Sequence, residues 1–157
     1  MAKRIGIDCK LYTCLTGGVF NAFNGSSNAP GSASLTLVST VKDVSWSMSR
    51  GSADKTTRAA ASEGIRYTEP TLGDLTLELT FLDDEDDAHL DLLKVAMVDR
   101  SEVPYAAMNH LEASAGSDGV TANFKIHDFS RAEPIDDMAA VTVTLRPSSF
   151  FDYYTSS

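Results

Sequence analysis

The segment "LTLELTFL", Leu75 to Leu82, carries the clearest strand pattern in this sequence. A large apolar residue stands at every second position from Leu75 to Phe81, and threonine or glutamate stands between them. Successive side chains of a strand point to opposite faces of a sheet, so the segment predicts a strand with one buried and one polar face. We therefore expect Leu77 and Leu79 in the core and Glu78 outside it.

The next segment, "DDEDDAHLDLLKVAMVD" (Asp83 to Asp99), predicts a helix. Leu90, Leu93 and Met97 fall at helical spacing and form an apolar stripe, with Leu92 and Ala96 beside them. Four carboxylates, Asp83 to Asp86, crowd its start, where the helix N-terminus favours negative charge. We expect this helix to begin in this segment, with the acids at its start, and to pack on one side of the sheet.

Upstream lies "VSWSMSRGSADKTTRAAASEGIRYTEP", Val44 to Pro70, which begins as a strand and then loses its pattern. Apolar residues alternate with serines as far as Met48, but residues 51–64 are almost all small, polar or charged. Such a segment buries too little apolar surface to order itself in a lone subunit. We expect residues 51–64 to form an extended loop, and "PTLGD" (Pro70 to Asp74) to form a turn before the next strand.

Further strand patterns lie on both sides of these segments. They cover Arg4–Asp8, Leu35–Thr40, Val41–Arg50, Val103–Glu112, Gly119–Arg131 and Ala139–Pro147, and Gly17–Ser34 predicts a surface loop. Roughly seven or eight strands joined by short turns, with one helix, indicate a mainly β fold. We predict a single domain over residues 1–157, an antiparallel β-sandwich or barrel with one flanking α-helix.

Charge is distributed unevenly along the chain. The formal net charge is -9, which argues against a protein that grips nucleic acid through its phosphates. The part through Arg66 has more Lys and Arg than Asp and Glu, whereas the part from Tyr67 onward is strongly acidic. Opposite charges at two ends of a molecule favour head-to-tail association of copies.

The two cysteines, Cys9 and Cys14, leave three alternatives open: a disulfide, half of a metal site, or two buried thiols. No apolar run has the length of a signal peptide or a membrane span, so we expect neither. The cytosol is then the default compartment, and reduced thiols are the favoured state.

An acidic run with a histidine, "DDEDDAH" (Asp83 to His89), is the strongest candidate for chemistry. Clustered carboxylates bind Mg²⁺ or Ca²⁺ when they converge, which would suit a small metal-dependent hydrolase. Consecutive helical residues fan out around the axis instead, so a solvated helix start is the favoured interpretation. His110 and His127 are scattered, without a serine elbow, Cys-His pair or phosphate loop. We expect no enzyme activity, cofactor or metal.

The last ten residues, 148–157, form an aromatic tail. Phe150, Phe151, Tyr153 and Tyr154 stand close to the chain end, where fraying is usual. Aromatic side chains gain free energy on burial, so we expect them to pack either on their own subunit or on a neighbour.

Two stretches resemble the major tail tube proteins of long-tailed, siphovirus-type bacteriophages. They are "VKDVSWSMSRGSADKTTRA" and "YTEPTLGDLTLELTFLDDEDDAHLDLLKVA", and the closing "VTVTLRPSS" fits as well. In that family a central strand ends in a polar, charged loop that often carries a D-x-T-x-R-type sequence. Here the matching residues are Asp54, Lys55, Thr56, Thr57 and Arg58.

The resemblance implies a self-assembling structural subunit. Six copies would form a ring, and rings would stack head to tail into a hollow tube that double-stranded DNA transits without specific binding. The long loop would reach the adjacent ring, which assigns ring stacking to Arg50, Asp54, Lys55, Thr57 and Arg58. A wall with net negative charge would repel DNA phosphates.

The same resemblance implies partners and a location. The chain would reside in the virion tail, after assembly in the host cytoplasm. Its partners would be other copies of itself and other tail proteins: tape measure, terminator, and distal tail or baseplate. The alternative within the same fold is a related ring or tube protein, such as a tail terminator or a secretion-system tube component.

Overall fold

The computed structural model describes residues 9–24, 35–57, 66, 68–111 and 116–155 of the 157-residue chain, with the backbone only at Leu72, Phe150 and Phe151. These residues form eight strands and helix α2 (Ala88–Asp99). The strands are β1 (Lys10–Thr16), β2 (Val19–Phe20), β3 (Leu35–Leu37), β4 (Val41–Asp54), β5 (Thr68–Leu82), β6 (Val103–Met108), β7 (Asp118–Ala132) and β8 (Ala140–Thr155). The predicted strand at Arg4–Asp8 lies outside the described residues.

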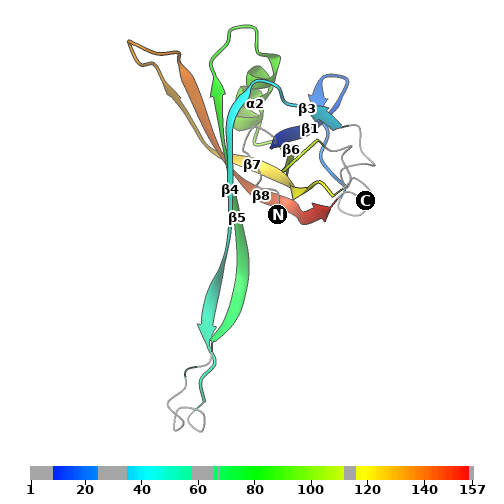
Figure 1. The fold of residues 1–157 in the computed structure, drawn as a ribbon, viewed down its shortest axis with the longest axis vertical. Helices are drawn as coiled ribbons and strands as arrows, with labels where there is room; N and C mark the ends of the chain where they lie inside the picture. The colour runs from blue at the N-terminus through cyan, green and yellow to red at the C-terminus, as the bar shows by residue number, and fades with distance from the viewer. Residues whose placement is uncertain (1–8, 25–34, 58–65, 67, 112–115, 156–157) are drawn as a thin grey trace.

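All strand pairs are antiparallel and belong to one sheet, in the order β2-β1-β6-β7-β8-β5-β4, with β3 also paired to β1. The sheet curls like half of a barrel, and α2 packs against β7 (Figure 1). The predicted fold class, mainly antiparallel β with one flanking helix, is confirmed. Of the two architectures expected, the curled sheet corresponds to a partial barrel.

The core lies on one face of this curled sheet and under α2. Leu77, Leu79 and Phe81 of β5 are 0–1% exposed, as their alternation predicts, and Leu90 and Leu93 of α2 pack in the same cluster. Glu78 is exposed on the opposite face.

The acids Asp83 to Asp86 precede the helix directly, as the sequence predicted. The helix begins at Ala88, because Asp87 is the N-cap and its side chain accepts hydrogen bonds from the N–H groups of His89 and Leu90. One detail differs from the prediction: Met97 is 38% exposed, and Ala96, expected beside the stripe, is buried in its place.

The buried face of β5 provides a direct stability test. We expect Leu79→Ala to lower the free energy of unfolding by about 2–5 kcal/mol, because it removes a fully buried side chain and leaves a cavity. Glu78→Ala, on the exposed face, is the control and should change it by about 0.5 kcal/mol or less. Chemical denaturation of both variants measures this difference. Equal effects would contradict the register of β5.

A long hairpin, here called the arm, extends from the body along the longest axis of the molecule (Figure 1). It consists of the distal halves of β4 and β5, where β5 has lost β8 as a partner: β5 pairs with β8 only from Leu77 to Leu82. The predicted loop 51–64 is shorter than expected, because β4 continues to Asp54. Residues 58–64 of that loop lie outside the described residues.

The predicted turn "PTLGD" is wrong. Strand β5 runs through Pro70–Asp74, and the pairing shifts by one residue there, from Arg50↔Gly73 to Ser52↔Pro70. This is a β-bulge in a two-stranded part of the sheet. Bulges and edge strands are the positions at which strands accept proline and glycine, so turn-like residues are compatible with continued pairing.

Two further segments depart from the sequence-based expectations. Strand β1 was not predicted, and β2 falls inside the predicted loop Gly17–Ser34; Gly17 and Gly18, with φ of 62° and 77°, make the tight turn between them. At the other end, β8 continues through Thr155 and pairs with β7. The backbone of residues 148–155 therefore belongs to the sheet rather than to a separate tail.

Candidate assembly surface

The arm carries most of the residues predicted for ring stacking. Arg50 stands at the bulge, and Asp54, Lys55 and Thr57 lie exposed toward the arm's end. Arg58 lies outside the described residues. Four of the five residues thus lie on one projecting element, and their role in ring stacking stays a prediction.

Two ion pairs link the two sides of the arm near the ends of β4 and β5. The guanidinium Nε of Arg66 lies 3.0 Å from Oδ2 of Asp54, and Nζ of Lys55 lies 3.2 Å from Oε2 of Glu69. Hydrogen bonds from Thr56, and to a smaller degree from Arg66, hold the pKa of Asp54 below its usual range. Pairs this exposed contribute little to stability. They link the two sides of the hairpin, so Asp54 and Lys55 are engaged within their own chain.

The root of the arm has an apolar side. Trp46 and Met48 of β4 stand opposite Leu77 and Leu75 of β5 and so share the face that forms the core. They are nevertheless 40% and 47% exposed, because β4 is the last strand of the sheet. Among the described residues, no strand covers the outer edge of β4. An exposed strand edge with apolar side chains beside it is a template for another chain.

A pocket of about 440 Å³ opens at this root, and we call it the root pocket. It lies where β8 separates from β5: the lining residues Leu75 and Pro147 stand two residues beyond the last pair, Leu77↔Leu145. Its lining is Met48, Ser49, Arg50, Gly73, Asp74, Leu75 and Pro147. The guanidinium of Arg50 has no hydrogen bond or ion pair with another described residue.

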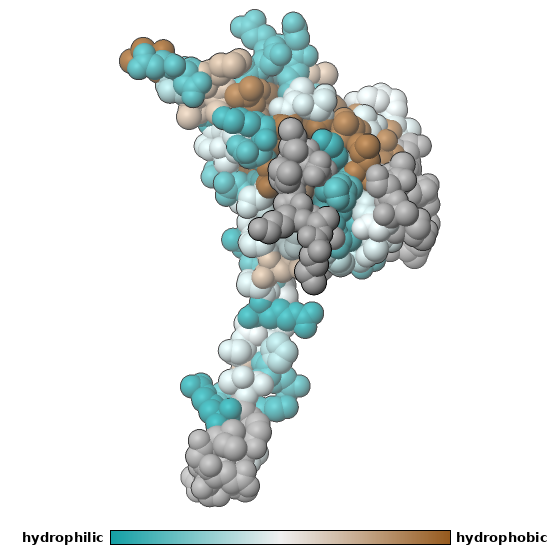
Figure 2. Space-filling view, viewed as in Figure 1, coloured by the Kyte–Doolittle hydropathy of each residue, from teal (hydrophilic) through white to brown (hydrophobic). Residues whose placement is uncertain are grey.

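The hairpin that joins β7 to β8 projects at the opposite end of the molecule from the arm (Figure 1). Ile135 is 100% exposed and Met138 is 61% exposed, and the space-filling view shows apolar colour at the end of this hairpin (Figure 2). Acidic residues Glu133, Asp136 and Asp137 surround them and are exposed. The sequence shows no strand or helix periodicity that predicts this tip. The available signal is "EPIDDM" (Glu133 to Met138), in which two apolar residues stand among acids.

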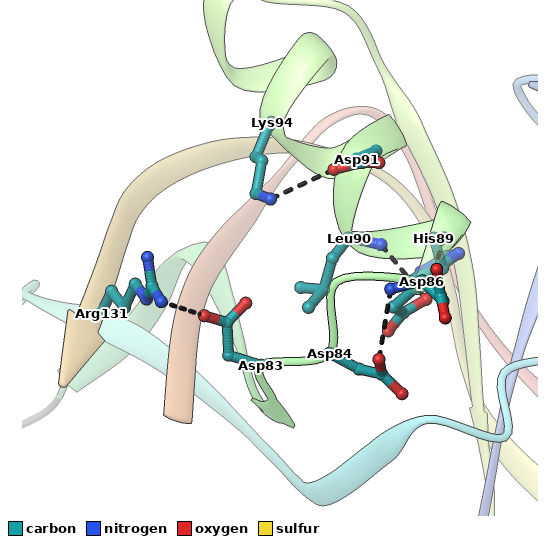
Figure 3. A network of polar contacts seen from close by, with 9 residues as sticks. Asp83, Asp84, Asp86, His89, Leu90, Asp91, Lys94 and Arg131 are labelled. Carbon is teal, nitrogen blue, oxygen red and sulfur yellow. Dashed lines mark hydrogen bonds and ion pairs between the residues drawn. The ribbon is translucent and has the colours of Figure 1, made fainter. Parts of the chain in front are cut away.

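The acidic run before α2 does not converge on one point (Figure 3). Asp83 pairs with Arg131 of β7 at 2.6 Å, Asp84 accepts a hydrogen bond from the N–H of Asp86, and Asp87 caps the helix. No group of three or more His, Cys, Asp or Glu in the described part of the chain is arranged to hold a metal ion. These carboxylates thus perform local structural roles.

His89 is packed among aromatic rings rather than exposed to solvent. Its Nε2 shares a 2.6 Å hydrogen bond with the hydroxyl of Tyr105, and the rings of Phe20 and Phe81 lie 5.5 and 5.8 Å from its own. Burial lowers the pKa of His89 to about 4, against the opposing charge of Asp87. Burial, and then the same charge, raises the pKa of Tyr105 well above its usual value.

This depressed pKa predicts an acid-sensitive fold. The unfolded state takes up a proton at His89 near pH 6.5, whereas the folded state resists until about pH 4. The contribution to stability is therefore complete above pH 6.5 and falls as the pH drops toward 4, by at most about 3 kcal/mol. Unfolding measured at pH 7 and pH 4.5 should show this loss in the wild type. His89→Gln should show a shallower loss, and an identical slope would contradict the assignment.

The C-terminal aromatics contact their own subunit where the side chains are described. Tyr154 packs against a small cluster that includes Tyr12 and Met108, and the hydroxyl of Tyr153 donates to Oδ2 of Asp118 at 3.0 Å. Tyr153 remains 50% exposed. The backbones of Phe150 and Phe151 pair with Asn123 and Ala122 of β7.

Neither cysteine is in a disulfide: Cys9 is exposed and Cys14 is buried, and both are free thiols. Burial raises the pKa of Cys14, so this thiol stays protonated and behaves as a small apolar side chain. In the part of the chain that the structure describes, no helix has the length and apolar character needed to cross a membrane.

No protein-family model and no curated protein matches the chain in sequence. Its fold is similar to that of several solved structures. The tail of an empty gene transfer agent particle, with C6 symmetry, matches with a TM-score of 0.70 and 12% identity over 97% of this chain and 99% of that chain. The virion of a native gene transfer agent particle matches with a TM-score of 0.66 and 10% identity over 97% and 99%.

The SPP1 tail tube matches with a TM-score of 0.63 and 10% identity over 99% of this chain and 80% of that chain. All three comparisons extend over nearly the whole of the present chain, so its complete fold, and not one part of it, is that of phage-type tail structures. The resemblance to tail tube proteins noted in the sequence is confirmed at the level of the fold.

Proposed function

We propose that the chain is the structural subunit of a phage-type tail tube, which self-assembles into hexameric rings stacked head to tail around a conduit for double-stranded DNA. The observation that carries this proposal is the match of the whole chain to a tail with C6 symmetry, which covers 97% of this chain and 99% of that one.

The exposed strand edges support lateral association into a ring. The order of the sheet leaves β4 at one end and the short β2 at the other. Two copies side by side can join such edges through main-chain hydrogen bonds, which extends the sheet from one subunit to the next. A curled sheet that repeats in this way closes into a larger barrel.

The polar face of the longest strands suits a wall past which DNA slides. The strand register forms two rows of polar residues across β4, β5, β8 and β7. One row is Asp43, Thr80, Thr142 and Ser130, and the other is Ser45, Glu78, Thr144 and Asp128. Hydroxyl and carboxylate groups dominate this face. The basic residues Lys125 and Arg146 stand opposite each other at one end of it. Carboxylates repel phosphates, and isolated hydroxyl groups bind them weakly, so DNA would pass without being held.

The remaining parts of the proposal follow from this role. The protein would be located in the virion tail after assembly in the host cytoplasm. It would contact tape measure, terminator, and distal tail or baseplate proteins at the ends or inside of the tube. We assign it no catalytic activity, cofactor or metal.

Assembly of the purified protein tests this function. Light scattering should rise above a threshold concentration, and electron microscopy should then show long hollow filaments, with or without a chelator such as EDTA. Single rings that never stack would favour the tail terminator alternative. A protein that stays monomeric at high concentration, or one that needs a divalent metal to fold, would contradict the proposal.

A further inference from the structure

We propose that the β7–β8 hairpin tip of one copy inserts Ile135 and Met138 into the root pocket of the next copy along the tube. This inference rests on the proposed function and adds the pair of surfaces that would interlock. The occupant of the pocket is thus a second copy of this chain, bound head to tail.

The tip has the properties of an anchor. Ile135 is 100% exposed and Met138 is 61% exposed, at the end of a hairpin that projects from the body (Figure 2). Full exposure of a large aliphatic side chain is unfavourable, and its burial in a partner's pocket removes apolar area from water. The rest of the tip is acidic and stays at the rim of such a contact.

The root pocket has complementary properties. Its volume of about 440 Å³ has room for both apolar side chains, and Met48, Leu75 and Pro147 give it apolar walls. Met48 is already 47% exposed and so offers surface without rearrangement. A side chain at Gly73 would meet only Arg50 and the carbonyl of Ser49, at 3.8–4.0 Å, so the wall at this point is open.

Charge favours this pairing and sets its orientation. Arg50 lines the pocket, and its guanidinium has no ion pair or hydrogen bond with another described residue. Asp136 and Asp137 follow Ile135 in the chain and are exposed. Asp74 also lines the pocket and repels them, so the acids of the tip should approach on the side of Arg50.

The positions of the hairpin tip and the root pocket allow their contact to repeat from copy to copy into a filament. The tip lies at one end of the long axis, and the arm extends from the other (Figure 1). A contact between two different surfaces of the same chain is heterologous, and when it does not close on itself it generates a filament. The arm and the tip would then bind across the same junction between rings, from opposite directions.

Cysteine cross-linking tests this contact directly. In a Cys9→Ser background, Ile135→Cys and Met48→Cys are combined, and the protein is assembled and oxidised. We expect ladders of covalent oligomers from tubes and none from the same protein below its assembly concentration. A variant with Ile135→Cys alone is the control and should give no ladder. Tubes without the ladder would overturn this inference and leave the proposed function intact.

Substitutions give a second, independent readout. Ile135→Asp should raise the concentration needed for tube formation at least tenfold and leave the melting temperature unchanged, whereas Val95→Asp, an exposed position on α2, should not affect assembly. Arg50→Glu should also weaken assembly, and Asp136→Arg in the same chain should restore part of it. Wild-type assembly thresholds for Ile135→Asp would overturn the inference. A wild-type protein that forms no tubes would overturn the proposed function together with it.

Discussion

A protein in which residues 51–72 are replaced by Asn-Gly should fold as stably as the wild type and form no tubes. The replacement removes the arm beyond the pair Arg50↔Gly73 and closes it with a two-residue hairpin turn. Described residues 51–55 and 68–71 are exposed and take no part in the core. A shorter loop also costs less entropy to close. The arm is the longest projection of the molecule, so its loss should remove the contact between rings.

Thermal melting, light scattering and electron microscopy of this variant separate folding from assembly. The melting temperature should stay within about 2–4 °C of the wild type, which corresponds to about 1 kcal/mol in a domain of this size. Ala53→Ser, on the arm itself, is the matched control and should assemble normally. Tubes of normal length from the variant without the arm would show that this hairpin is an ordinary surface projection.

The second large effect concerns Gly119, where strands β6 and β7 approach closely. A Cβ at this position would collide with the carbonyl oxygen of Ala107 and lie 2.8 Å from the Cα of Met108. Both obstacles are backbone atoms of the paired strand, so neither can move away without breaking the β6–β7 pairing. We expect Gly119→Ala to lower the free energy of unfolding by about 3 kcal/mol or more.

Gly73→Ala is the control for this effect. A Cβ there meets only Arg50 and the carbonyl of Ser49, at 3.8–4.0 Å, which is ordinary contact. Its free energy of unfolding should stay within about 0.5 kcal/mol of the wild type. Denaturant titrations of the two variants measure the comparison, and a Gly119→Ala protein as stable as Gly73→Ala would contradict the close approach of β6 and β7.

The fold could be predicted where one face of an element is buried and the other is not. Alternation from Leu75 to Phe81 and the spacing of Leu90 and Leu93 marked β5 and α2 because solvent lies on one side of each. Strand β1 gives no such signal, since its residues 11–14 are all buried and include a threonine and a cysteine. Periodicity reports asymmetric burial, and a segment buried on both faces lacks it.

Residues that usually interrupt strands account for the wrong boundaries. Pro70 and Gly73 in β5, and Pro147 in β8, all stand at or beside register shifts. A bulge accommodates an extra residue and lets pairing resume, which the local sequence does not distinguish from a turn. For this reason the strands of the arm are longer than expected and its loop is shorter. For the same reason the aromatic segment continues β8 and does not form a separate tail.

The candidate site was partly accessible from sequence. A long, polar, charged segment between two strands identified the arm and its residues Asp54 and Lys55. Their partners Arg66 and Glu69 depend on the register of the hairpin, which residue types alone do not determine. Ile135 became visible only through its complete exposure at a projecting tip. Single apolar residues in turns are common, and sequence alone gives no measure of exposure.

Helical reconstruction by cryo-electron microscopy of filaments grown from the purified protein is the most direct test of the tail tube function. We expect a hollow tube of stacked six-subunit rings, in which the arm of each subunit lies against the next ring. We also expect the face bearing Glu78 and Thr144 to border the lumen. Filaments without a lumen, or rings whose arms contact only their own ring, would contradict these expectations.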